Sequence, residues 1–205
     1  MTGPTHRRYS VCFALISTII IYKYNITSIN YYLSLIIILM ASKAGAIFPD
    51  LDHEWHNVGV KTVPNWIINK LIHITGGKHR SWQTHSIDIC AIFTLLAIIL
   101  PNILYNKSLI SDVNKEMLSI LMIGFASGWI SHLFADMLTS AGVRLLFFVK
   151  KPVKLVPRKI GPLVFNTGNE WESFNYKVIN IINILLGIGC LLYPFIIGYL
   201  EYIKI

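Results

Sequence analysis

Apolar residues are gathered into five runs along the chain, and polar segments separate these runs. The runs cover residues 9–24, 31–48, 87–104, 117–138 and 178–200. A helix needs about 17–25 mainly apolar residues to cross the hydrocarbon core of a bilayer, and the last four runs come close to that length. The first run is short, which favours a tilted or half-inserted helix. The pattern therefore predicts an all-α fold, an integral membrane helical bundle of about five hydrophobic helices.

Two of the polar segments are long enough to carry structure of their own. They cover residues 49–86 and 139–177, whereas the segments 25–30 and 105–116 are short. Residues 64–74 combine apolar and polar positions in a pattern typical of an amphipathic helix in the membrane interface: Trp66, Ile67 and Leu71 are apolar, and Asn65, Asn69 and Lys70 are polar. The apolar run 143–149, which two lysines follow, fits the same location.

The N-terminus is similar to a secretory signal sequence, because Arg7 and Arg8 precede an apolar run. The small-residue cleavage pattern of a signal sequence is missing, since the run passes directly into Tyr22-Lys23-Tyr24-Asn25. We therefore expect a first helix that is retained, and a single membrane-embedded domain over residues 1–205.

The composition favours a membrane protein and a lipid partner. Of the 205 residues, 54% are apolar and 14% are charged, whereas soluble domains carry about 25% charged residues. The net charge of +8 lies in loops between apolar runs, which indicates membrane lipids as partners and no nucleic acid. Cys12, Cys90 and Cys190 lie inside apolar runs without CxxC spacing, as small buried side chains do.

The distribution of Lys and Arg predicts on which side of the membrane the long segments lie. With alternating helices, the N-terminus and both long segments share one side. That side holds thirteen basic residues: Arg7, Arg8, Lys61, Lys70, Lys78, Arg80, Arg144, Lys150, Lys151, Lys154, Arg158, Lys159 and Lys177. The other side holds four: Lys23, Lys107, Lys115 and Lys204. Because cytoplasmic loops carry the excess of basic residues, we expect the long segments to face the cytoplasm.

Histidines and acidic residues gather at the helix ends on that same side. They are His6, then Asp50, Asp52 and His53, then His79 and His85, then His132 and Asp136, and finally Glu170 and Glu172. Since the topology was assigned from Lys and Arg alone, this agreement is independent support for one shared site. His56 and His73 fit no pattern, and we expect no role for them.

The fourth apolar run carries the most informative spacing. Gly124, Gly128, His132 and Asp136 recur every four residues, which puts them on one helix face. The glycines would let a neighbouring helix approach closely, and the imidazole and carboxylate would follow one turn apart. Such a pair fits metal ligation, and it equally fits a hydrogen bond between helices.

The other candidates also have ordinary structural interpretations. Pro49 and Asp50 are typical of a helix boundary and its capping residue. His79 and His85 lie in a basic loop, where surface histidines are common. Thr84 or Ser86 would cap the following helix or orient an imidazole.

Together these motifs resemble those of the bacterial inner-membrane metal-dependent hydrolase family, over nearly the whole chain. They are His6, Pro49-Asp50-Leu51-Asp52-His53, His79-Arg80, Thr84-His85-Ser86, the block Gly128-Trp129-Ile130-Ser131-His132-Leu133-Phe134-Ala135-Asp136-Met137-Leu138-Thr139-Ser140-Ala141-Gly142, and Gly168-Asn169-Glu170-Trp171-Glu172. The family's Gly-Asn-x-x-Glu pattern falls on Glu172. His79 and His85 are six positions apart, where the family spaces its histidines by five. The set is also similar to the ligands of zinc-dependent phospholipases C.

The resemblance and the clustering together predict a metal site in a multi-pass protein of the bacterial inner membrane. The candidate ligands are His6, Asp50, His53, His79, His85, His132 and Asp136. One four-coordinate zinc ion uses fewer ligands, which predicts two or three ions sharing carboxylates. Mixed imidazole and carboxylate ligation suits zinc, with manganese or iron as alternatives.

The expected activity is hydrolysis of a phosphoester in a lipid or lipid-linked substrate by metal-activated water. Arg80 would hold the phosphate, and Asp52 or Glu172 would act as the general base. Two alternatives stay open. A membrane transporter should carry its ionisable residues at mid-depth, and a structural membrane protein would use the metal only to staple its helices.

Overall fold

The computed structural model describes residues 3–24, 26–139, 141–144, 146–149, 151–155 and 170–203. Its helices are α1 (Gly3–Lys23), α2 (Tyr31–Ile47), α3 (Val63–Ile74), α4 (Trp82–His85), α5 (Ile87–Asn106), α6 (Asp112–Met137) and α7 (Glu170–Ile203), with short 3-10 turns η1 (Pro49–Asp52) and η2 (Trp55–Asn57). Strands β1 (Val143–Arg144) and β2 (Pro152–Val153) form a small antiparallel pair. The all-α membrane bundle predicted from the sequence is confirmed.

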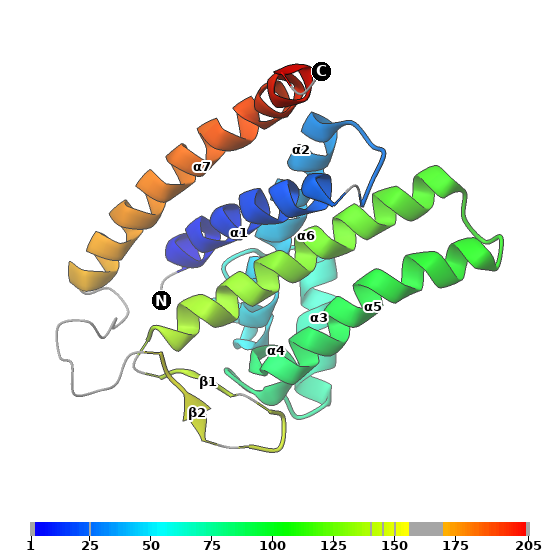
Figure 1. Ribbon diagram of the computed structural model, residues 1–205. Coiled ribbons are helices and arrows are strands. Elements are labelled where there is room, and N and C mark those ends of the chain that lie inside the picture. The colour runs from blue at the N-terminus through cyan, green and yellow to red at the C-terminus, as the bar shows by residue number, and fades with distance from the viewer. Residues whose placement is uncertain are drawn as a thin grey trace.

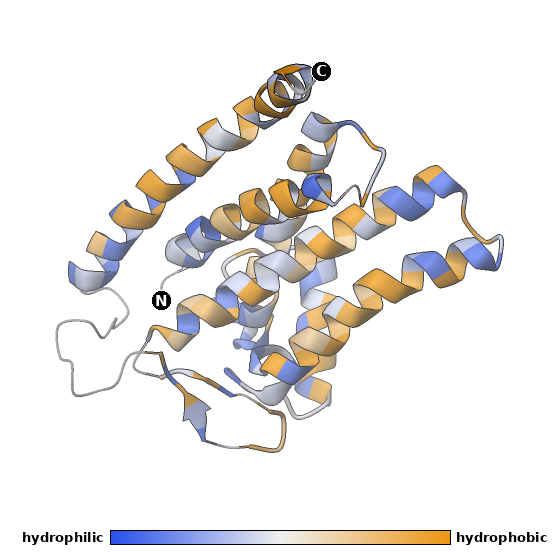
Figure 2. Ribbon diagram, in the orientation of Figure 1, coloured by the Kyte–Doolittle hydropathy of each residue, from blue (hydrophilic) through white to orange (hydrophobic). Residues whose placement is uncertain are grey.

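Four helical segments in the described part of the chain are long and apolar enough to cross a membrane. They are Tyr31–Asp52, Ile87–Asn106, Asp112–Met137 and Glu170–Leu200. Figure 1 shows α5 and α6 as an antiparallel pair, with α1 beside α6 and α7 on the outside against α1. Hydrophobic residues follow α5, α6 and α7, and hydrophilic residues gather at the helix ends (Figure 2). Large parts of α5 and α7 are therefore available to lipid.

Helix α1 is not among these four candidate spans, and it occupies the interior of the bundle. It packs against α2, α6 and α7, and it buries polar Thr5, His6, Ser10 and Thr18. The Ser42 hydroxyl of α2 donates a hydrogen bond of 2.9 Å to the Ser10 carbonyl. A helix surrounded by other helices can satisfy polar groups within the protein, which explains why its apolar run is the shortest.

This helix also begins earlier than the predicted range 9–24. It starts at Gly3, because a proline such as Pro4 is tolerated in the first turn of a helix. His6 therefore lies inside α1, where helix geometry fixes its direction, and not in the segment before it.

The closest helix pair is α2 with α6, and glycines make this contact. A Cβ atom on Gly128 would overlap the Ser42 carbonyl oxygen, and one on Gly45 would overlap the Phe125 carbonyl. A Cβ on Gly124 would lie 2.9 Å from the Cβ of Ala41. The role predicted for Gly124 and Gly128 is thus confirmed, and the contact sets the positions of the residues at the end of both helices.

Candidate metal centre

The seven predicted ligands converge at one end of the bundle, although they come from separate segments. α1 supplies His6, η1 and the residue after it supply Asp50 and His53, the segment around α4 supplies His79 and His85, and α6 supplies His132 and Asp136. Their rings form a continuous chain of contacts. Ring centroids are 3.8 Å apart for His6 and His132, 5.3 Å for His132 and His85, 5.8 Å for His85 and His79, and 3.6 Å for His79 and His53.

The carboxylate of Asp136 lies at the middle of this cluster. Its Oδ1 is 3.4 Å from His6 Nε2, and its Oδ2 is 3.6 Å from His85 Nε2 and 3.7 Å from His132 Nε2. These distances exceed those of good N–H···O hydrogen bonds, which are 2.7–3.2 Å. Two ligands held at about 2.1 Å by one tetrahedral ion would be about 3.4 Å apart. The spacing of the donor atoms therefore matches ligation better than direct pairing.

In each of two groups, three donor residues lie close enough together to bind one ion. One is His6, His132 and Asp136, and the other is Asp50, His85 and His132, with ligand atoms within 4.8 Å of one another in each group. Asp50 reaches the centre through Oδ1, which is 3.7 Å from His132 Nε2. Its side chain is 30% exposed, so the centre opens outward on the Asp50 side.

In two of the histidines, Nδ1 contacts an oxygen outside the cluster of donors, while Nε2 faces the cluster. His132 Nδ1 lies 2.7 Å from the carbonyl of Ala46, which is in the last turn of α2 and lacks a helical donor. His85 Nδ1 lies 3.0 Å from Asp52 Oδ2. If each Nδ1–H donates to these oxygens, each Nε2 presents a lone pair to the centre.

These Nε2 atoms supply the test of whether the residues fit a metal. In the described part of the chain, the buried Nε2 atoms of His85 and His132 have no hydrogen-bond partner. Buried polar atoms in proteins are nearly always partnered, and leaving one unsatisfied costs about 1–3 kcal/mol. Ligation of a divalent ion would satisfy both nitrogens, so the donor set fits such an ion.

Asp52 lies behind the histidines. Its two oxygens accept hydrogen bonds from His79 Nδ1 at 3.1 Å, the backbone N–H of Arg80 at 2.8 Å, the Thr84 hydroxyl at 2.7 Å and His85 Nδ1 at 3.0 Å. Its side chain is fully buried. The structure thus gives Asp52 the geometry of a residue that orients two imidazoles. Thr84, expected to cap or to orient, contacts this carboxylate.

Arg80 and Glu172, the other predicted catalytic residues, both lie beside the cluster. Arg80 Nη2 is 3.3 Å from Asp136 Oδ1, which puts a positive charge against the centre. Glu172, in the first turn of α7, is buried and accepts a hydrogen bond of 2.8 Å from the Thr5 hydroxyl, next to His6. Gly168 and Asn169 of the same predicted motif lie outside the described residues.

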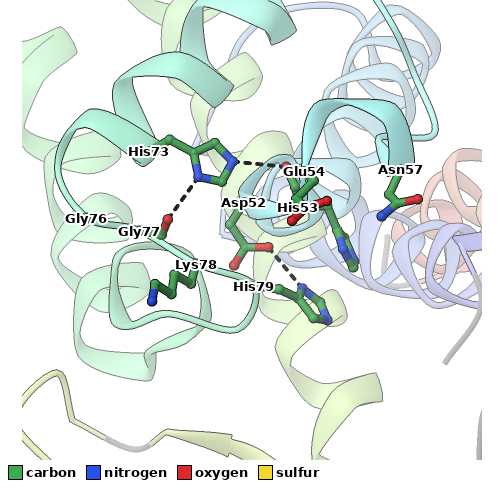
Figure 3. Close-up of a pocket in the computed structure, with 9 residues that line it drawn as sticks. All are labelled: Asp52, His53, Glu54, Asn57, His73, Gly76, Gly77, Lys78 and His79. Atoms are coloured by element: carbon green, nitrogen blue, oxygen red, sulfur yellow. Dashed lines mark hydrogen bonds and ion pairs between the residues drawn. The ribbon is translucent and has the colours of Figure 1, made fainter.

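A cavity of 730 Å³ opens beside the outer histidines (Figure 3). It is lined by Asp52, His53, Glu54, Asn57, His73, Gly76, Gly77, Lys78 and His79. The stacked rings of His53 and His79 stand at its edge and are partly exposed. Burial lowers the pKa of His53, and the neighbouring His79 lowers it further. A neutral imidazole is the form that binds metal.

Two residues that support this edge were not expected from the sequence. His73 lies 3.0 Å through Nδ1 from the Gly77 carbonyl and 3.1 Å through Nε2 from the His53 carbonyl. Asn69 is buried and donates to the carbonyls of Leu51 and His53, both at 2.7 Å. The sequence put Asn69 on a polar helix face, and no local signal showed that this face packs against η1. His56 is exposed beside Glu54.

Comparison with known proteins identifies relatives in the bacterial inner membrane. The family model described as YdjM inner membrane protein matches residues 1–199. Inner membrane protein YdjM of Escherichia coli (strain K12) is 31% identical over 131 residues, which are 62% of this chain and 55% of that protein. The protein of the same name from Shigella flexneri matches to the same extent. The alignment thus spans about half the length of these relatives. No solved structure matches the chain.

Proposed function

The chain belongs to the YdjM inner membrane protein family, and we propose that it is a metal-dependent hydrolase acting on a phosphoester of a lipid or lipid-linked substrate. It is a multi-pass inner membrane protein, with four helical segments in the described residues that are long and apolar enough to cross a membrane. The observation that carries the proposal is the convergence of imidazoles and carboxylates at one end of the bundle, with buried Nε2 atoms of His85 and His132 that have no hydrogen-bond partner in the described part of the chain.

The number and arrangement of donors support more than one ion. Asp136 directs Oδ1 toward His6 and Oδ2 toward His85 and His132, so both of its oxygens would be available as ligands. His53 and His79, with Asp50, extend the donor set outward. A bound ion would lower the pKa of a coordinated water to about 7 and polarise the ester. Zinc suits these ligands, with manganese or iron as alternatives.

The side chains around the donors would divide the remaining work. Asp52 would hold His79 and His85 in position, since the four hydrogen bonds it accepts engage both of its oxygens. Glu172, the other of the two residues predicted as general base, would take that role. Arg80, tied to Asp136 by Nη2, would bind the phosphate group, for which a planar guanidinium is well suited.

The position of the cluster favours a substrate that lies in the membrane. Asp52 ends one candidate span, and His132 and Asp136 lie in the last turns of another. Nearby, Trp66, Leu71 and Ile74 of α3 are exposed, as expected of an interfacial helix. From the distribution of basic residues we propose that this end faces the cytoplasm.

One structural feature favours a second candidate, a metal that only staples the fold. His6, His132, Asp136 and His85 are all buried and join three separate helices, as ligands of closed structural sites do. A transporter is less well supported, because the cluster lies at one end of the helices and not at mid-depth.

The test combines metal content with turnover. Protein purified in detergent without added metal should contain at least one zinc, manganese or iron ion per chain by elemental analysis. The metal-loaded protein should release phosphate or a head group from at least one member of a set of phosphorylated lipids and lipid-linked phosphates. Full metal occupancy with no hydrolysis across that set would favour the structural site and reject the hydrolase.

A further inference from the structure

A second, smaller cavity lies against the candidate metal centre, on the side formed by Arg80 and the β1–β2 pair. Its volume is 200 Å³, and Arg80, His85, Gly142, Val143 and Arg144 are among its lining residues. His85 belongs to both the cavity and the centre, because its Nε2 lies 3.6 Å from Asp136 Oδ2. A group held in this cavity would therefore be adjacent to the proposed ions.

The Arg80 guanidinium connects the two. Nη2 contacts Asp136 Oδ1 at 3.3 Å, while Nη1 is buried and has no hydrogen-bond partner among the described residues. The backbone holds this arginine at φ 59°, a conformation that is uncommon for a residue other than glycine. Its N–H donates to Asp52, which keeps the backbone in place. Thus Nη2 of Arg80 contacts the centre, and Nη1 is available to donate a hydrogen bond to a bound group.

Arg144 brings a second positive charge to the same cavity. It lies on β1, pairs with Pro152 of β2, and forms a bridge to Ser86, the residue after His85. No carboxylate of the described residues lies within ion-pair distance of Arg144. Two arginines that line one small cavity bring like charges to it, and an anion bound in the cavity would be attracted by both.

We propose that this cavity binds the terminal phosphate group of the substrate, with Arg144 as the residue that selects for it. The inference rests on the proposed hydrolase function and names its substrate class as a phosphomonoester. Arginine forks match the oxygens of a phosphate in charge and geometry. The volume corresponds to about seven water molecules at ~30 Å³ each, which is enough for a phosphate group.

The experiment measures binding of inorganic phosphate to the metal-loaded, detergent-purified protein by isothermal titration calorimetry. Arg144→Gln should weaken binding by about 10- to 100-fold, the loss expected when a hydrogen bond between charged groups is removed. Arg144→Lys should fall in between, because it keeps the charge without the fork. Lys151→Gln, an exposed change beside β2, should bind as the unmodified protein does. Equal phosphate affinity for Arg144→Gln and Lys151→Gln would overturn the assignment.

Metal content and the thermal unfolding midpoint, measured on each variant, exclude loss of folding as the cause. If Arg144→Gln unfolds, the phosphate affinity of Arg144→Lys serves as the test. An affinity equal to that of the unmodified protein would overturn the assignment. Phosphate binding that depends on Arg144 without hydrolysis of any substrate would support this site and reject the hydrolase. Hydrolysis that does not depend on Arg144 would support the hydrolase and reject the phosphate site.

Two competition arms then distinguish the source of the phosphate. Phosphatidic acid in phosphatidylcholine nanodiscs represents a lipid headgroup, and glycerol 3-phosphate represents a soluble ester. Displacement of bound phosphate by either supports a phosphomonoester site and identifies its source. Displacement by neither would reject it.

Discussion

At the scale of single residues, the histidines of the candidate metal centre differ in what holds their second ring nitrogen. His132 is oriented by a helix-end carbonyl, and His85 and His79 by the carboxylate of Asp52. Partners of this kind fix the tautomer and direction of a ligating imidazole. His56, in contrast, is exposed and pairs only loosely with Glu54. The two kinds of histidine therefore make a matched comparison.

Replacing His132 should remove metal from the protein. His132→Ala deletes the donor common to both compact groups of three, so we expect a clear loss of bound metal and of any turnover, measured by elemental analysis and phosphate release. His56→Ala is the control and should keep both. Full metal content in His132→Ala would show that this residue is not a ligand.

Asp52 can be assigned as a positioning residue or as a general base by one comparison. Asp52→Asn replaces one acceptor oxygen with a donor group that faces Nδ1–H groups, so His79 and His85 should lose their orientation. Metal affinity should fall by about 10- to 100-fold, measured by competition with a chelator. Glu172→Gln should keep its metal and lose about 10²–10⁴ in rate if Glu172 is the base. If Asp52→Asn keeps its metal but loses rate, and Glu172→Gln loses metal affinity, Asp52 is the general base and Glu172 the positioning residue.

At the scale of elements, the contact between α2 and α6 determines the geometry of the centre. Gly128 lies one turn before His132, and the α2 backbone at Ser42 and Ala46 occupies the space where its side chain would be. The same stretch of α2 supplies the carbonyl that orients His132 and leads into η1, which carries Asp50. Packing of these helices therefore decides whether the donors meet.

Adding one methyl group at this contact should destabilise the protein. Gly128→Ala forces the Cβ against the Ser42 carbonyl, and overpacking of this kind typically costs about 1–3 kcal/mol. We expect a lower thermal unfolding midpoint and weaker metal retention in detergent. Gly187→Ala in α7 is the control, because nothing lies within 4 Å of its Cβ position. Equal midpoints for the two variants would contradict the close packing.

At the scale of the whole molecule, the bundle has apolar helix faces available to lipid and a polar end that contains the candidate metal centre. The centre, the 730 Å³ cavity and the arginine-lined cavity all lie around the chain segments that follow α2 and α6. The opposite end carries the connection between α5 and α6 (Figure 1). Which end faces the cytoplasm determines which leaflet a substrate would come from.

Single cysteines can test this sidedness in intact cells. On a background in which the buried Cys12, Cys90 and Cys190 are replaced by alanine, His56→Cys reports the centre end and Leu109→Cys the opposite end. Both positions are exposed. A membrane-impermeant thiol reagent should label only Leu109→Cys. Labelling of His56→Cys instead would show that the topology is inverted and that the candidate metal centre lies at the outer leaflet.

The sequence by itself determined the class of fold, because apolar run length and helical spacing are local properties. It gave the order of the helices, the glycine face of α6, and the His132–Asp136 pair one turn apart. It also indicated that the remaining ligand candidates share one membrane side, because successive membrane-spanning helices alternate in direction and every second connection lies on the same side.

Only the tertiary structure decided what these residues contact. Asp50 and Asp52 are two positions apart, yet one faces the centre and the other lies behind His79 and His85, because η1 turns between them. Arg80 and Arg144 share a cavity only because β1 packs beside α4. Such contacts join segments far apart in the chain, and they depend on how closely whole helices approach, which no local pattern specifies.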